Sequence, residues 1–157
     1  MTSRRAGQGG LLAAVVGLGA AIAGCSLEPD VGPRLAGTCD DADTQPDTPV
    51  SFSRDIRPLI SRSTGGCACH LPNQAGTGMG TQLSGLDLSS YQTLRAGGFN
   101  SGAMVAVAGE PCSSIIYLKL SAAPPFGSRM PLNGPPFFTA DELRLVHDWI
   151  AEGASDN

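Results

Sequence analysis

The sequence predicts an all-α domain of short helices joined by long loops rich in glycine and proline. Three observations predict this fold class. The 157 residues include 21 glycines and 12 prolines, which indicate many turns. Apolar residues recur at helical spacing in several short segments, and no segment alternates apolar and polar residues as a half-buried strand does. Hydrophobic residues make up 41% of the chain, enough for the core of one domain.

The first predicted helix covers residues 52–60. Its apolar residues fall at positions i, i+4, i+7 and i+8, which is one face of a helix: Phe52, Ile56, Leu59 and Ile60. Ser51 or Ser53 is expected to cap its N-terminus, and Gly65-Gly66 to end the segment. The residues that follow Cys67-Ala68-Cys69-His70, as far as Gly85, are rich in glycine and threonine and are expected to form a loop.

Two further short helices and one longer helix complete the expected domain. Residues 89–94 predict a helical turn that ends at Gly97-Gly98, and Ser113 or Ser114 is expected to cap a helix over 115–120. A proline-rich loop follows. Thr139 and Glu142 then form a capping-box pattern at the start of the last helix. Its buried stripe is expected to consist of Leu143, Val146, Trp149 and Ile150. His147 is expected on its surface or flank.

The N-terminus indicates export. Two arginines precede an apolar run over residues 11–23, which is shorter than the roughly 20 residues that a membrane-spanning helix needs. The run ends in Ile22-Ala23-Gly24-Cys25, which resembles the bacterial lipobox and implies cleavage before Cys25 and lipid on its thiol. Residues 1–24 are therefore expected to be a lipoprotein signal peptide. A plain signal peptide or an uncleaved anchor is the alternative.

The expected location is the cell envelope, with the protein anchored to the membrane by its N-terminal lipid. Ser26 rather than aspartate follows the modified cysteine, which favours the outer membrane, with the protein facing the periplasm or the cell surface. Residues 25–48 are expected to be a disordered acidic tether, because they carry almost no large apolar residue. The folded domain is expected over residues 49–157. The charged residues of the tether are Glu28, Asp30, Arg34, Asp40, Asp41, Asp43 and Asp47.

Charge and motifs exclude several function classes. The formal net charge is −4, which argues against a nucleic-acid partner, since phosphate contacts need clustered lysine and arginine. The chain has no phosphate-binding loop, no nucleophile elbow and no paired carboxylates at helical spacing. We therefore expect a protein that is not an enzyme.

The cysteine pattern predicts a cofactor. Short helices and long loops form a thin core, which a flat apolar cofactor in the middle would complete. Cys69-His70 matches the end of the c-type haem attachment signal, in which the thiol forms a thioether and the histidine binds iron. Met130, in a Gly-Ser-Arg-Met-Pro segment, is the expected second iron ligand, because its thioether sulfur suits low-spin iron.

Six landmarks in order resemble the cytochrome c-like domains of planctomycete and myxobacterial exported proteins. The landmarks are Phe52–Ile60, Cys69-His70, Ser84–Ser89, Val107–Pro111 with Ser114, Arg129–Pro131 and Trp149–Ala154. The resemblance covers about two thirds of the chain. It implies a small cytochrome c-like domain that holds one covalently attached haem c, binds the haem iron and transfers electrons to a redox partner protein.

The motif departs from the usual Cys-x-x-Cys-His, because one residue separates Cys67 from Cys69. Residues i and i+2 lie about 200° apart around a helix axis, so both thiols cannot easily reach one edge of a porphyrin. Cys69 is therefore the expected thioether. Cys67 belongs to the same cofactor-binding motif and is also a candidate for a disulfide with Cys112 or Cys39.

Two other accounts remain open. One is a binding or structural lipoprotein that kept the scaffold without haem and is stapled by disulfides among Cys39, Cys67, Cys69 and Cys112. The other is a copper site that uses Cys67, Cys69, His70 and a distant methionine, since soft sulfur ligands select that metal.

Overall fold

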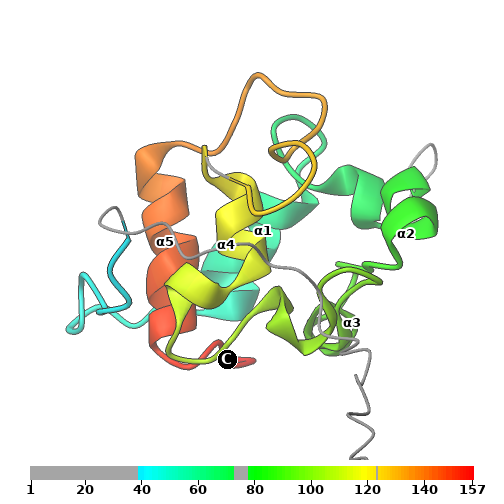
Figure 1. The fold of residues 1–157 in the computed structure, drawn as a ribbon. Helices are drawn as coiled ribbons and strands as arrows, with labels where there is room; N and C mark the ends of the chain where they lie inside the picture. Colours follow the sequence, from blue (N-terminus) through cyan, green and yellow to red (C-terminus); the bar gives the residue numbers. More distant parts are fainter. Residues whose placement is uncertain (1–38, 73–77, 123) are drawn as a thin grey trace, which may run out of the picture.

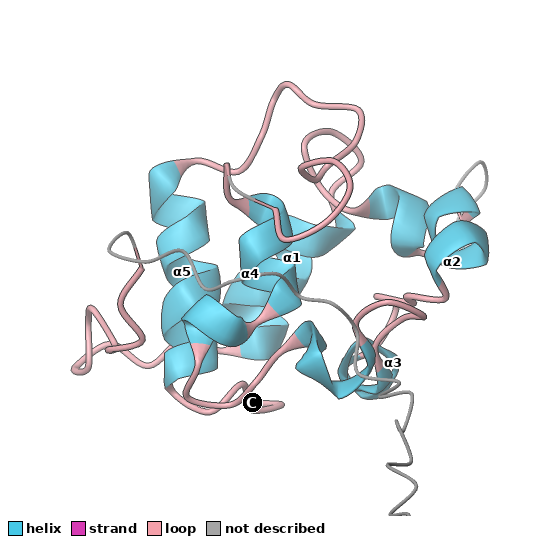
Figure 2. Cartoon of the chain, viewed as in Figure 1, coloured by secondary structure: helices cyan, strands magenta, loops and turns pink. Residues whose placement is uncertain are grey.

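The computed structural model describes residues 39–72, 78–122 and 124–157. These residues form helices and no strand, which confirms the all-α class (Figure 2). The helices are α1 (Arg57–Ser61), α2 (Met79–Ser84), α3 (Tyr91–Ala96), α4 (Ile115–Leu120) and α5 (Ala140–Ala151). Single turns, here called η, are η1 (Phe52–Ile56), η2 (Ala68–His70), η3 (Gly102–Val105) and η4 (Pro111–Ser113). The predicted signal peptide and Cys25 lie outside the described residues.

The first predicted helix is confirmed, although it has two parts. The π-helical turn η1 leads directly into α1, and the Ser51 side chain accepts a hydrogen bond from the Arg54 backbone N–H as an N-cap. Phe52, Ile56 and Ile60 are buried. The expected apolar face therefore points into the core.

The helices expected in the second half are also present. Ser90 and Thr93 form a capping box at α3, and Gly97 ends that helix. Thr139 and Glu142 form the capping box expected at α5. Ser114 stands at the N-cap position of α4, but the expected side-chain cap is absent. Its hydroxyl instead accepts from the Val107 N–H at 2.7 Å and donates to the Glu110 carbonyl at 2.9 Å.

Helix α5 forms the centre of the core. Trp149 is only 1% exposed, and its ring centroid lies 5.5 Å from that of Phe52. Tyr91 packs edge-on against the other side of Phe52, at 5.4 Å, and its hydroxyl donates to the Ala154 carbonyl. Figure 1 shows α4 beside α5, and α2 on the far side of the molecule from α5. The core therefore lies at one end, and α2 projects from it.

The loop expected from His70 to Gly85 contains a helix that the sequence did not predict. Helix α2 has glycines at both ends, with Gly78 at φ +94° and Gly85 at φ +70°, and no side chain caps it. It buries none of its residues completely. Because it lacks both a capping side chain and a buried stripe, the two usual sequence signals for a helix are absent.

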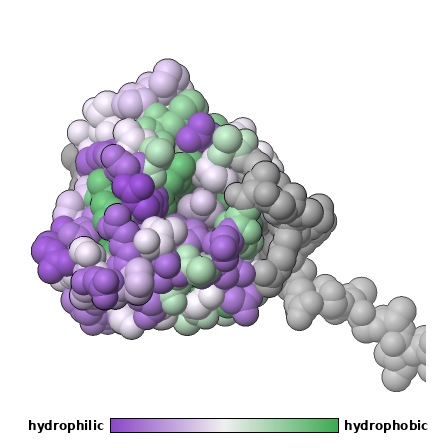
Figure 3. All heavy atoms as spheres, turned by 90° about the vertical axis from the view of Figure 1, so that its left-hand side faces the viewer, coloured by the Kyte–Doolittle hydropathy of each residue, from purple (hydrophilic) through white to green (hydrophobic). Residues whose placement is uncertain are grey.

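The acidic tether was predicted to extend to residue 48, and the structure corrects this for residues 39–48. Cys39 forms a disulfide with Cys112, at a Cα–Cα distance of 5.8 Å. Thr44 donates to the Asp148 carboxylate from its backbone N–H at 3.1 Å and from its hydroxyl at 2.7 Å. A disulfide and hydrogen bonds thus hold a segment that has too little apolar surface to order itself. Figure 3 shows hydrophilic side chains gathered over the lower part of the face that this segment shares with α5.

His147 was expected on the surface, and it is buried instead. It is 7% exposed, with Nδ1 2.9 Å from the Asp148 carboxylate and Nε2 2.5 Å from the Asp40 carbonyl. Asp148 is 2% exposed. Burial alone would raise the pKa of Asp148, but the hydrogen bonds from Thr44 and His147 lower it below its ordinary value. The segment over 39–48 covers this His-Asp pair.

Replacing Glu142 by glutamine is expected to lower the free energy of unfolding by about 1–2 kcal/mol at neutral pH. Both oxygens of Glu142 accept hydrogen bonds from the Arg62 guanidinium, one of them at 3.0 Å. These bonds lower the pKa of Glu142. When folding lowers the pKa of a carboxylate, its charge stabilises the fold at pH values above the unfolded-state pKa. This contribution is lost as the pH falls through the folded-state pKa. Glutamine keeps the capping-box geometry and removes only the charge.

Urea unfolding at roughly pH 7 and pH 3 measures this effect, because these values lie on either side of the ordinary glutamate pKa. The difference between wild type and Glu142→Gln is expected to be smaller at the lower pH. Asp141→Asn is the control, since that carboxylate is 81% exposed and pairs only with Arg144. If Glu142→Gln and Asp141→Asn lost equal free energy of unfolding, the loss could not be assigned to the Arg62–Glu142 pair.

Candidate functional site

A cavity of about 440 Å³ lies between η2, α2, α4 and the loop that joins α4 to α5. Its walls are mainly apolar, and its size is in the range of small-molecule and cofactor sites. The four residues predicted to bind the cofactor all line it: Cys67, Cys69, His70 and Met130. The fold therefore brings together residues that are sixty positions apart in the sequence.

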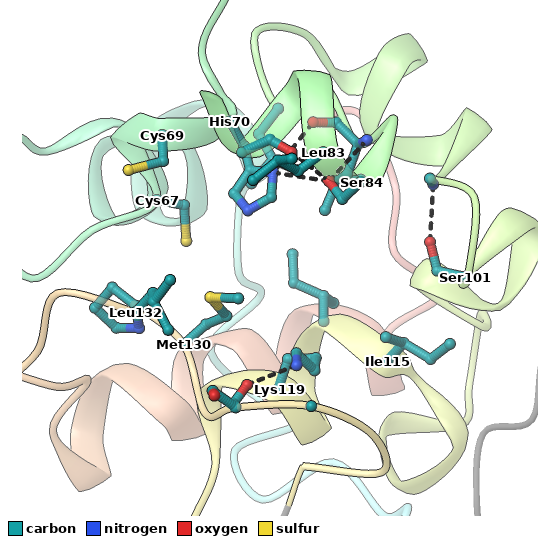
Figure 4. A pocket seen from close by; sticks show the side chains of 18 of the residues that line it. Cys67, Cys69, His70, Leu83, Ser84, Ser101, Ile115, Lys119, Met130 and Leu132 are labelled. Atoms are coloured by element: carbon teal, nitrogen blue, oxygen red, sulfur yellow. Dashed lines mark hydrogen bonds between the residues drawn. The ribbon is translucent and has the colours of Figure 1, made fainter. Parts of the chain in front are cut away.

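The His70 ring presents one nitrogen to this cavity. Its Nδ1 lies 3.2 Å from the Leu86 carbonyl oxygen and 3.4 Å from the Ser84 hydroxyl. A carbonyl can only accept, so Nδ1 carries the proton and Nε2 has the free lone pair. Figure 4 shows the other ring nitrogen directed into the cavity. Among the described residues, none forms a hydrogen bond with Nε2.

The surroundings of His70 keep its ring neutral. Burial lowers the pKa of His70 below its ordinary value, and the Lys119 ammonium lowers it further, while the hydrogen bond to Leu86 opposes both. Neutral imidazole is the form that binds metals. A hydrogen bond from Nδ1–H to a backbone carbonyl is also the usual arrangement that orients a ligating histidine. His70 can therefore act as a ligand through Nε2.

Met130 lies across the cavity from His70 (Figure 4). It belongs to the irregular loop between α4 and α5, is half-buried, and packs against the hydrophobic core. Its backbone N–H donates to the Lys119 carbonyl at 2.7 Å. The structure thus places the two predicted iron ligands on opposite sides of one space.

The two cysteines of the motif differ in environment. Cys67 is 7% exposed and its thiol points into the cavity, whereas Cys69 is exposed and lies at the edge (Figure 4). Burial raises the pKa of the Cys67 thiol to about 12. Thiolates are the reactive form of cysteine, so Cys69 is the more reactive of the two.

The predicted disulfide of Cys67 with Cys112 or Cys39 is wrong. Cys112 pairs with Cys39, and both Cys67 and Cys69 are free thiols. The reason is that residues 39–48 pack on the side of α5 and η4, which brings Cys39 to Cys112, while Cys67 is enclosed within the cavity wall.

Three exposed apolar side chains surround the mouth of the cavity, and the sequence analysis did not identify them. Met79 is 69% exposed, Leu83 is 78% exposed and Leu132 is 71% exposed, and all three line the cavity. Met79 and Leu83 lie one turn apart on α2. This helical spacing was not recognised, because the glycine-rich segment around it predicted a loop. Lys119, the only lysine of the chain, also lines the cavity and was not identified.

Gly80 in α2 is in close contact with the histidine turn. A Cβ at this position would lie 2.8 Å from the Cys69 carbonyl oxygen and 3.0 Å from His70 Cε1. Both distances are shorter than a normal contact, so the absence of a side chain lets α2 pack against η2. This packing places Ser84 and Leu86 beside the ring.

Gly80→Ala is expected to lower the free energy of unfolding by about 1–3 kcal/mol, because overpacking outweighs the better helix propensity of alanine. Urea unfolding measures the loss. Gln82→Ala is the matched control, since Gln82 is exposed on the same helix and its replacement is expected to change stability by less than about 0.5 kcal/mol. A stabilised Gly80→Ala protein would show that α2 and η2 do not pack as described.

Within the described ranges, no three histidine, cysteine, aspartate or glutamate side chains cluster so as to hold a metal ion by themselves. In the same part of the chain, no helix is both long and apolar enough to cross a bilayer. Comparisons with models of protein families, with curated proteins and with solved structures find no match to this chain. The resemblance to cytochrome c-like domains therefore rests on the sequence landmarks alone.

Proposed function

We propose that this chain is a lipid-anchored c-type cytochrome-like protein that binds one haem and transfers electrons. The observation that carries the proposal is the shared cavity, where His70 Nε2 and the Met130 side chain face each other across largely apolar walls. These features suit a flat apolar macrocycle. The two side chains supply the nitrogen and the thioether sulfur that low-spin haem iron takes as axial ligands.

Each of the four cavity residues has a distinct part in holding the group. His70 would bind the iron through Nε2, with its ring held by the Leu86 carbonyl. Met130 would be the second axial ligand. Cys69 would form the thioether, because its thiol is exposed and adjacent to the ligand. Cys67, with its raised pKa, would remain a thiol that packs inside the cavity.

The bound haem would supply the redox chemistry, since its iron takes up and releases one electron. The protein then needs no general base and no substrate site, which agrees with the proposal that it is not an enzyme. The apolar walls would keep water away from the bound group and, together with Met130, would raise its reduction potential. A redox partner protein would exchange electrons with it.

The place of action follows from the sequence. Lipid on Cys25 would tether the domain to the cell envelope, most simply at the outer membrane. Residues 39–48 would not take part in this tether, because they are held on the domain.

A non-haem lipoprotein stapled by disulfides is the second candidate, and the Cys39–Cys112 bond is the observation that favours it. That bond lies away from the cavity and leaves the two motif cysteines as thiols. A structural role for this disulfide therefore does not explain the apolar cavity.

Production of the full-length protein in a bacterial host that attaches c-type haem tests the proposal. We expect a red protein with the absorption bands of low-spin haem, in which the haem remains bound after denaturation. A colourless protein with a normal disulfide would support the second candidate. Metal analysis of the same sample distinguishes the copper account.

A further inference from the structure

Lys119 joins the loop that carries Met130 to α4. Lys119 lies in the last turn of α4, and its ammonium group donates to the Phe126 carbonyl at 2.8 Å and to the Ser128 carbonyl at 2.6 Å. The same group lies 4.8 Å from the centre of the Phe126 ring. No carboxylate pairs with it among the residues that the structure describes. Two loop carbonyls thus stabilise its positive charge.

The backbone of Lys119 adds a third bond to the same segment. Its carbonyl accepts from the Met130 N–H at 2.7 Å. The neighbouring Arg129 donates from Nε to the Leu120 carbonyl at 3.1 Å and stacks 4.2 Å from the centre of the Phe137 ring. Residues 126–130 are therefore held at both ends by the C-terminal turn of α4.

We propose that Lys119 is a positioning residue for Met130: its ammonium holds residues 126–130 against α4 so that the Met130 sulfur faces His70 across the cavity. The inference rests on the proposed function for the role of Met130 as an iron ligand. It assigns a task to a side chain of the cavity wall that is not one of the proposed iron ligands.

A lysine at position 119 is well suited to holding residues 126–130. Hydrogen bonds from a charged donor to a carbonyl are stronger than those between neutral groups. Two such bonds from one ammonium close a turn that contains Gly127 at φ +55°, a left-handed conformation that glycine adopts readily. Loss of the ammonium would free the turn while the backbone bond from Met130 remained.

Two variants of the full-length protein test the inference. Lys119→Met keeps the apolar stem of the side chain and removes its donors, and Lys119→Arg restores donors and charge. Hydrogen–deuterium exchange of peptides that cover 126–130 is expected to be faster by about tenfold or more in Lys119→Met, because two hydrogen bonds from a charged donor are lost and each is worth about tenfold. Lys119→Arg is expected to exchange at a rate closer to wild type.

Spectroscopy of the ferric protein gives a second readout. Lys119→Met is expected to keep its covalent haem but to lose much of the weak long-wavelength band that sulfur ligation produces. Added imidazole should then displace Met130 at a roughly tenfold lower concentration. Arg144→Met is the control for charge alone, since Arg144 is exposed on α5 and pairs with Asp141.

Wild-type exchange and an unchanged sulfur band in Lys119→Met would overturn the inference. Equal effects in Arg144→Met would also overturn it, because they would show a general effect of charge. A wild-type protein without haem contradicts the proposed function instead. In that case the exchange rates of 126–130 still decide whether Lys119 holds the loop.

Discussion

Replacement of Cys69 by alanine is expected to leave the purified protein without covalently bound haem, whereas Cys67→Ala should retain it. Cys69 is adjacent to His70, exposed and at the edge of the cavity. Cys67 also lines the cavity, but its pKa of about 12 leaves almost no thiolate at neutral pH. The pyridine haemochrome spectrum after denaturation and extraction measures the covalent fraction.

The two cysteine variants are matched, because both remove one thiol from the same motif and leave the Cys39–Cys112 disulfide intact. Circular dichroism of each variant separates loss of haem from loss of fold. Haem that survives in Cys69→Ala, or that is lost from a folded Cys67→Ala, would contradict a single thioether at Cys69.

Met130→Leu is expected to lower the reduction potential by on the order of 0.1–0.3 V, a part of the roughly 0.8 V range over which axial ligands set haem potentials. Leucine keeps the apolar volume of the methionine and removes its sulfur. The ferric protein should also lose the absorption band of sulfur ligation. Potentiometric titration of the purified variant measures the shift.

Met79→Leu is the matched control for this substitution. Met79 also lines the cavity, but it is 69% exposed and belongs to α2, the helix that packs against the turn containing His70. We expect its replacement to leave the potential near that of wild type. If Met79→Leu lowered the reduction potential more than Met130→Leu, then Met79 and not Met130 would be the second ligand.

The fold was predictable from the sequence where local signals agreed. The capping box of α5 and its apolar stripe lie in one short segment. The structure confirms the capping box and buries Val146, Trp149 and Ile150 of the stripe, while Leu143 is half-buried. Helix α2 lacks such signals, because its ends are glycines and its apolar residues are exposed. The order of residues 39–48 was not predictable, since it depends on a disulfide and on hydrogen bonds to Asp148, more than a hundred residues away.

The candidate site was predictable in its principal residues and not in their surroundings. His70 and Met130 were identified from short motifs, and the structure places both in one cavity. His147 was misplaced because its burial depends on the segment that covers it. The task of Lys119 depends on the path of a loop without periodicity, so no pattern in the sequence indicates it.

The central claim is that haem is attached beside His70, and peptide mass spectrometry of the matured, full-length protein tests it most directly. The account predicts that the peptide containing Cys67, Cys69 and His70 carries the mass of one haem, localised by fragmentation to Cys69. A peptide recovered from correctly exported protein with both thiols unmodified, or joined to each other, would contradict it.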